Sequence, residues 1–196
     1  MKRRFSLGIG VGLWIALAVF GCRTPPDVVR VKMDYTPTNV VTPPKSFPRT
    51  LIFMPPIEDQ RKDPDLIGQN SESPKAVPVK ADPAAIRLFV ADAFKKEFKK
   101  VGLNVVESEA EASRILKVTL LNLWVEEKST YQSSLVAQVT VLDKSGKKLF
   151  DDSFKAMAQR WGTSYDESEY RKAISDTVVE LLKNLFNNEA FLKGLS

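Results

Sequence analysis

The chain has 196 residues, of which 43% are hydrophobic and 27% are charged, a composition typical of a globular protein with one core. One cysteine and no histidine exclude an internal disulfide, histidine-dependent zinc sites and catalytic triads that use histidine. The net charge of +5 includes Lys2, Arg3 and Arg4; the remaining 26 basic and 24 acidic residues leave +2, which predicts no nucleic-acid partner.

Residues 1–21 are typical of a secretory signal peptide. The three basic residues near the start are followed by an uncharged, mainly apolar stretch over residues 5–20. This stretch is shorter than the roughly 20 residues that a membrane-spanning helix needs. Gly8 and Gly12 leave a dimerising transmembrane helix as the less favoured alternative.

The end of this segment resembles the bacterial lipobox, because Val19 and Gly21 precede Cys22 at the spacing of that motif. The resemblance implies cleavage after Gly21, diacylglycerol on the Cys22 thiol and acylation of the new amino terminus. Three acyl chains are more than the two signals that stable anchoring requires. In enterobacterial lipoproteins, an aspartate directly after the lipidated cysteine resembles a signal for retention in the inner membrane. This chain has Arg23 at that position, so we expect the protein to lie at the periplasmic face of the outer membrane.

Residues 22–48 are predicted to be a tether between the lipid and the domain. No helical or strand period persists here, and proline-rich segments behave as semi-rigid spacers. A docking ligand for a proline-binding partner is the alternative, which the lack of a clean P-x-x-P motif at Lys45–Pro48 disfavours. The prolines are Pro25, Pro26, Pro37, Pro43, Pro44 and Pro48.

Residues 49–196 are predicted to form one domain. Thr50–Met54 is an apolar run typical of a short buried strand, and the polar stretch Ile57–Val79 is expected to be a long loop. Asp82-Pro83 then supplies a helix cap and a first-turn proline. Apolar residues recur at helical spacing up to the C-cap position of Gly102.

The following segments predict a run of strands. Leu103–Val106 is short, and Ile115–Val125 is long with apolar residues on both faces, which either a bulge near Leu120 or burial of both faces would explain. Tyr131–Val141 alternates with period two, and a turn at residues 143–146 leads into Phe150–Ala158.

A second helix is predicted from the possible capping box of Ser164 and Glu167 to Asn187-Asn188. Its apolar residues from Tyr170 to Phe186 fall on one face. The expected fold is therefore a two-layer α/β sandwich, with a mixed sheet of about five strands and two amphipathic helices on one face.

The segment from Met54 to Arg61, with Ile67-Gly68 downstream, resembles the opening of the YajG family of bacterial lipoproteins. The family pattern is a strand, a proline and Asp-x-Arg, here Asp59 and Arg61. Residues 102–116 are similar too, although Arg114 stands where family members usually carry an aspartate. The resemblance covers residues 49–191 and implies a fold related to the amino-terminal domain of TolB, with no catalytic residues.

Asp59 and Arg61 are the strongest polar candidates for a site. Two residues apart just beyond a strand, they would form an ion pair that pins the loop, or belong to a recognition loop over residues 58–70. Trp124 and Trp161, near the ends of later strands, would contribute to a partner surface if they cluster on an uncovered sheet face. Our candidate partner-binding residues are therefore Asp59, Arg61, Trp124 and Trp161.

Two acidic pairs, Glu126-Glu127 and Asp151-Asp152, are expected to be solvated charges, because adjacent strand residues point to opposite faces.

Taken together, the sequence features predict a non-enzymatic envelope lipoprotein without a metal or cofactor. We expect it to be an adaptor or assembly component that binds an envelope protein. The alternative is a periplasmic carrier of lipid or a small molecule. An exposed aromatic patch over a filled core favours the adaptor, and a pocket of a few hundred Å³ favours the carrier.

Overall fold

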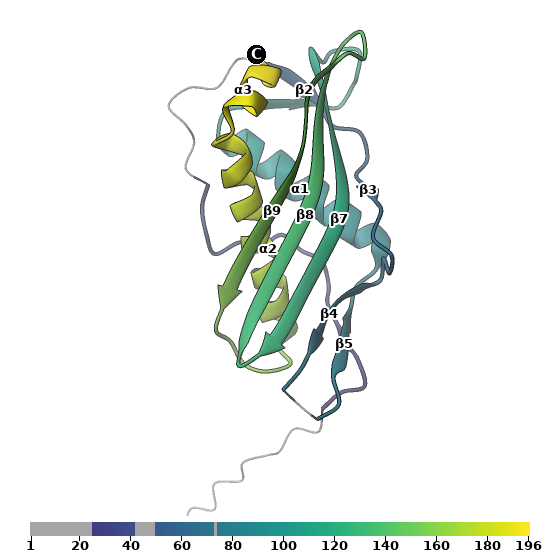
Figure 1. Ribbon diagram of the computed structural model, residues 1–196, viewed down its shortest axis with the longest axis vertical. Helices are drawn as coiled ribbons and strands as arrows, with labels where there is room; N and C mark the ends of the chain where they lie inside the picture. The colour runs from purple at the N-terminus through teal and green to yellow at the C-terminus, as the bar shows by residue number, and fades with distance from the viewer. Residues whose placement is uncertain (1–24, 42–49, 73) are drawn as a thin grey trace, which may run out of the picture.

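The computed structural model describes residues 25–41, 50–72 and 74–196, which form a mixed sheet with helices packed on one of its faces (Figure 1). The α/β architecture is confirmed, but within the described residues the sheet has nine strands instead of about five. In chain order the elements are β1 (Val29–Arg30), β2 (Leu51–Phe53), β3 (Glu58–Asp59), β4 (Leu66–Asn70), β5 (Val77–Lys80), α1 (Pro83–Lys100), β6 (Asn104–Val106), β7 (Arg114–Lys128), β8 (Thr130–Asp143), β9 (Lys148–Arg160), α2 (Glu167–Phe186) and α3 (Glu189–Leu195).

Strand β7 is the centre of the sheet. One edge pairs in antiparallel fashion with β8, which pairs in turn with β9, so the three long strands form a meander (Figure 1). Along its other edge, β2, β3 and β4 pair in parallel with residues 114–115, 119–120 and 125–127 of β7. The expectation of a loop over residues 57–79 is therefore wrong, because β3, β4 and β5 lie there.

Gly68 marks a close approach between β4 and β7. A Cβ atom at this position would lie 1.9 Å from the carbonyl oxygen of Val125. Because no side chain fits in that space, glycine is required for the two strands to pair.

Of the two explanations for the apolar residues on both faces of β7, a bulge near Leu120 is the one that the structure confirms. The pairing of β7 with β8 shifts register between Leu120 and Asn122. Leu120 and Leu123 are consequently both buried, whereas Leu121 is 38% exposed and Trp124 is partly exposed. The extra residue keeps one face of the strand apolar on both sides of the bulge.

Helix α1 has the predicted ends. The Asp82 carboxylate accepts a hydrogen bond from the Ala85 N–H at 2.8 Å, and Gly102 follows the helix with φ +86°. The predicted capping box of α2 is wrong, because Asp166 is the N-cap and accepts from the Ser168 N–H at 2.8 Å.

Helix α3 was not predicted. Asn188 caps it by accepting from the Phe191 N–H at 2.9 Å, which starts a new helix directly after α2. Phe191 is fully buried, and its ring centroid lies 5.6 Å from that of Phe150 on β9. The short helix therefore closes one end of the core.

Residues 29–41, which we call the strap, pack against the domain although the sequence analysis assigned them to the tether. Strand β1 pairs in parallel with β5. The Asp176 carboxylate of α2 accepts from both the N–H and the hydroxyl of Thr38 at 2.6 Å, and the Tyr35 hydroxyl donates to Glu97 of α1 at 2.9 Å. Alternate side chains of the strap are buried: Val29, Val31 and Met33.

One hydrophobic core fills the space between sheet and helices. It includes Phe94 and Phe98 of α1 and Phe186 of α2, whose rings pack with centroids 5.4 to 5.8 Å apart. The inward residues of β7 and β8 are almost completely buried against these helices: Leu116, Val118, Leu120, Leu135, Ala137, Val139 and Val141.

Candidate partner-binding surface

Asp59 and Arg61 form a bidentate ion pair at the end of β3. Arg61 Nε lies 2.9 Å from Asp59 Oδ1, and an Arg61 terminal nitrogen lies 2.8 Å from Oδ2. Arg61 also donates to the carbonyls of Pro64 (2.5 Å) and Leu66 (3.2 Å), which closes the turn between β3 and β4. The predicted pair is present, and it shapes this turn from within.

Both side chains of the pair are nearly buried, with exposures of 5% for Arg61 and 3% for Asp59. Burial alone would raise the pKa of Asp59, but the hydrogen bonds and charge of Arg61 outweigh it and hold the pKa below its usual value. The carboxylate therefore stays ionised, and the pair presents little of itself to a partner. Partner contact by these two residues stays a prediction.

A surface groove of about 270 Å³ lies between this turn and β7. The ion pair forms one wall through Arg61, and the bulge of β7 forms the other through Leu121 and Trp124. The lining residues are Arg61, Lys62, Asp63, Leu66, Leu121, Asn122, Leu123 and Trp124. The structure thus brings Asp59, Arg61 and Trp124 together.

The groove is lined by Leu121 and Trp124, which lie on the more exposed face of β7. Figure 1 shows the helices on the opposite face of the meander. Trp124 pairs with Ser134 of β8, which pairs with Met157 of β9, so these three side chains form a row across the sheet. Met157 is 62% exposed. The remaining outward residues of β8 are mostly polar and uncharged: Gln132, Val136, Gln138 and Thr140.

Trp161 does not join this row. It follows β9 and lies four residues beyond Met157, roughly 13 Å farther along the strand direction. Its side chain is the most exposed large hydrophobic group of the described residues, at 76%. The candidate residues therefore occupy two separate places, the groove and the loop after β9.

Glu127 corrects the expectation that Glu126-Glu127 is a solvated pair. The two residues do point to opposite faces, but Glu127 is buried and only Glu126 is partly exposed. The Glu127 carboxylate accepts hydrogen bonds from the hydroxyls of Tyr170 and Ser164 and from the Tyr165 N–H. The sequence signal was the alternation of β7, which places Glu127 on the same face as the buried Leu123 and Val125.

This buried cluster holds the loop between β9 and α2. Burial and the hydrogen bond to Glu127 raise the pKa of Tyr170, so the phenol keeps the proton that it donates. Tyr131 donates in addition to the Thr163 carbonyl, and its ring packs edge-on against Tyr170 with centroids 4.8 Å apart. The loop that carries Trp161 is therefore held at the end that leads into α2.

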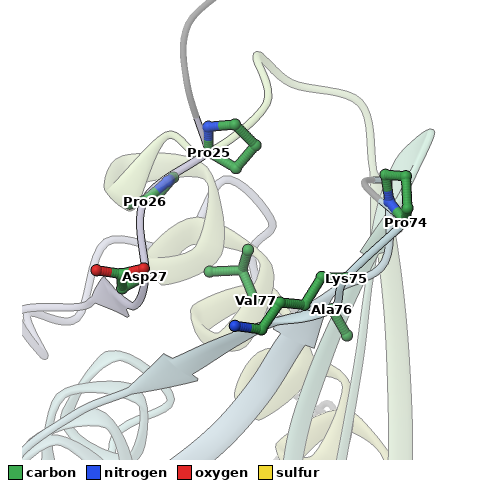
Figure 2. Close-up of a pocket in the computed structure, with 7 residues that line it drawn as sticks. All are labelled: Pro25, Pro26, Asp27, Pro74, Lys75, Ala76 and Val77. Carbon is green, nitrogen blue, oxygen red and sulfur yellow. The ribbon is translucent and has the colours of Figure 1, made fainter.

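A second groove, of about 310 Å³, lies where the described chain begins (Figure 2). Pro25, Pro26 and Asp27 form one side, and the residues that lead into β5 form the other: Pro74, Lys75, Ala76 and Val77. Its lining is mainly apolar, and it is open to the surface. Cys22 and Gly21, the predicted lipidation and cleavage positions, lie outside the described residues.

Across residues 25–41, 50–72 and 74–196, the helices are all too short or too polar to cross a membrane. In the same part of the chain, no three histidine, cysteine, aspartate or glutamate side chains are grouped so as to hold a metal ion.

No family model matches this chain, and no curated protein matches its sequence. Protein XCC0632 from Xanthomonas campestris, which carries the family designation DUF330, has a similar structure, with a TM-score of 0.56 and 15% identity over 80% of this chain and 94% of that one. This likeness shows the fold alone.

Two other solved structures are bacterial lipoproteins with more distant likeness. GNA1162 from Neisseria meningitidis has a TM-score of 0.39 and 10% identity over 59% of this chain and 88% of that one. A minor lipoprotein from Acinetobacter baumannii has a TM-score of 0.39 and 10% identity over 72% and 92% of the two chains.

Proposed function

We propose that this chain is a non-enzymatic lipoprotein of the bacterial envelope and that its domain binds a protein partner in the groove beside Trp124. Lipid on Cys22 would hold it at the periplasmic face of the outer membrane. The lipobox supports the anchor, and the Asp59-x-Arg61 motif supports kinship with the YajG lipoproteins. We assign no catalytic residue, metal or cofactor.

One observation carries the partner-binding proposal. The turn between β3 and β4 lies beside the face of the meander that the helices leave uncovered. The Asp59–Arg61 pair holds the turn through two backbone carbonyls, so one wall of the groove is formed before any partner arrives. A preformed site avoids the free-energy cost of ordering a loop on binding. Tryptophan and methionine are enriched at protein interfaces. The groove contains Trp124, and the adjoining row contains the exposed Met157.

Site-specific photocrosslinking in cells tests this proposal. A benzoylphenylalanine at Leu121, in the groove, is expected to give one dominant crosslinked envelope protein, and Trp124→Ala should remove that product. The matched control is the same probe at Leu88, which is 70% exposed on α1 in the other layer. Equal crosslinking from both positions, or none from Leu121, would contradict the proposal.

Mass spectrometry of the amino terminus of the full-length protein, purified from cells, tests the lipid anchor. An acylated Cys22 is expected, and Cys22→Ala should release the chain from the membrane fraction. An intact, unmodified residue 1 would overturn the lipoprotein assignment.

A carrier of lipid or a small molecule is the second candidate, and the apolar groove in Figure 2 favours it, because about 310 Å³ falls in the size range of ligand sites. Ligand sites usually enclose most of their ligand, whereas this groove is open and the space between sheet and helices is filled. Lipid that copurifies in a constant ratio with the Cys22→Ala chain would favour the carrier over the adaptor.

A further inference from the structure

Four segments that are distant in sequence meet at one end of the molecule, which we call the anchor end. Residues 25–27 face residues 74–77 across the groove in Figure 2. Two residues earlier, the Glu72 carboxylate accepts from the Ser129 N–H at 3.0 Å, and its other oxygen lies 2.6 Å from the Ser164 hydroxyl oxygen. The anchor end therefore comprises residues 25–27, 72–77 except 73, 128–130 and 161–164.

The anchor end is also where the described chain leads toward Cys22. Three residues of chain span at most about 11 Å, so Pro25 lies no farther than this from Cys22. The next step rests on the proposed lipidation of Cys22. Lipid on that residue would hold the anchor end, and no other part of the domain, against the bilayer surface.

The chemistry of the anchor end suits a lipid surface. Trp161 is highly exposed, and tryptophan is the residue that is enriched at the level of lipid headgroups, because its ring is apolar and its N–H is polar. The exposed charges balance, with Asp27 and Glu72 against Lys75 and Lys128. A balanced surface has no net attraction to anionic lipid, so contact would depend on aromatic and apolar groups.

The loop that carries Trp161 is fixed before any contact is made. Thr163 and Ser164 are hydrogen-bonded to Tyr131 and Glu127 of the meander. At Gly162 a Cβ atom would lie 2.6 Å from Cγ of Glu169, so the backbone there packs closely on α2. Little ordering of the loop would be needed for the tryptophan to enter the headgroup layer.

We propose that the anchor end docks directly on the bilayer that holds the lipid of Cys22, with the Trp161 side chain in the headgroup layer. Docking gives the anchored domain a defined orientation. The groove beside Trp124 then stands away from the lipid.

Tryptophan quenching in vesicles tests this docking. The full-length lipidated protein is reconstituted into phosphatidylcholine vesicles with or without lipid brominated near the headgroup. Mass spectrometry first verifies cleavage, which removes Trp14 and leaves Trp124 and Trp161. In the Trp124→Phe variant, brominated lipid is expected to reduce emission roughly twofold, because its remaining tryptophan would lie at the interface.

The matched control is Trp161→Phe, in which the remaining Trp124 is expected to keep its emission. Unquenched emission from both variants that nevertheless float with the vesicles would overturn docking and leave the anchor standing. Equal quenching of both would also overturn it, because the sheet face would then lie on the bilayer. Failure of the cleaved protein to float would overturn docking and anchor together.

Discussion

Strands β7, β8 and β9 run side by side for 13 to 15 residues each, whereas β1 to β5 have two to five residues each. The meander is stabilised by continuous backbone pairing and by one apolar face packed on the helices. The short strands depend on individual polar contacts and close approaches, such as the Asp59–Arg61 pair and Gly68 against Val125. In the first region many residues share the stabilisation, and in the second a few residues each contribute much of it.

The largest expected effect comes from the core of the meander. Leu120→Ala removes a fully buried side chain and should lower the free energy of unfolding by about 4 kcal/mol, measured by urea denaturation. Leu121→Ala, one residue away but on the exposed side of the bulge, is the control and should cost less than about 1 kcal/mol. Similar losses for the two variants would mean that the bulge lies elsewhere.

A single change among the short strands should lower the free energy of unfolding almost as much, because Arg61 bonds both Asp59 and the carbonyls of Pro64 and Leu66. Arg61→Met leaves the Asp59 carboxylate buried without its partner and should lower the free energy of unfolding by about 3 kcal/mol at pH 7. Asp59→Asn combined with Arg61→Met should recover part of this loss, since no unpaired charge remains. If the single and double variants are equally stable, the pair contributes nothing specific.

The Asp59–Arg61 pair also predicts how the free energy of unfolding changes with pH. The pKa of Asp59 is lower in the folded chain than in the unfolded chain, where it is about 3.9. Its contribution is therefore present above pH about 4 and lost as the pH falls through the folded pKa. The difference in the free energy of unfolding between wild type and Arg61→Met should narrow as the pH falls. The narrowing begins in the variant, where burial without Arg61 raises the pKa of Asp59, and ends below the folded pKa of the wild type.

The smallest expected effect concerns the start of α2, where the two regions meet. Asp166→Ala removes the N-cap acceptor and should cost about 1 kcal/mol in thermal or urea unfolding. Asp166→Asn keeps an acceptor oxygen and should cost much less. A neutral Asp166→Ala would indicate that another residue caps the helix.

The sequence predicted the regions whose stabilisation is repetitive. Helix α1 has a cap, a proline and a period of 3.6. The apolar residues of β7 change face near Leu120, which left a bulge and burial of both faces as equal explanations until the pairing with β8 was known. Strands β3 and β4 show no period, because each is ordered by its pairing partner and not by its own pattern. In β5 the buried Val77 and Val79 do alternate with Pro78 and Lys80, but four residues are too few for a clear signal. The strap did carry a signal, since Val29, Val31 and Met33 alternate with charged residues, but the neighbouring prolines obscured it.

The candidate site was predictable only in part. The spacing of Asp59 and Arg61 was enough to predict their ion pair, because two residues of loop suffice to bring them together. That Leu121 and Trp124 face the same groove depends on the parallel pairing of β3 and β4 with β7, which joins residues about 60 positions apart in sequence. The sequence alone did not show that Trp161 lies apart from Trp124, because this depends on where β9 ends.

The strap would have a mechanical consequence under the proposal that lipid on Cys22 holds the domain at a membrane. A pull through Cys22 enters at residue 25 and loads the strap first, where β1 pairs with β5 over two residues and Asp176 holds Thr38. Such a pull would break these contacts one after another. The backbone hydrogen bonds between β7, β8 and β9 would carry no force until the strap had detached. Detaching residues 25–41 would expose the core residues Val29, Val31, Met33 and Val41. It would also add up to roughly 55 Å of extended chain between a lipid on Cys22 and the rest of the domain.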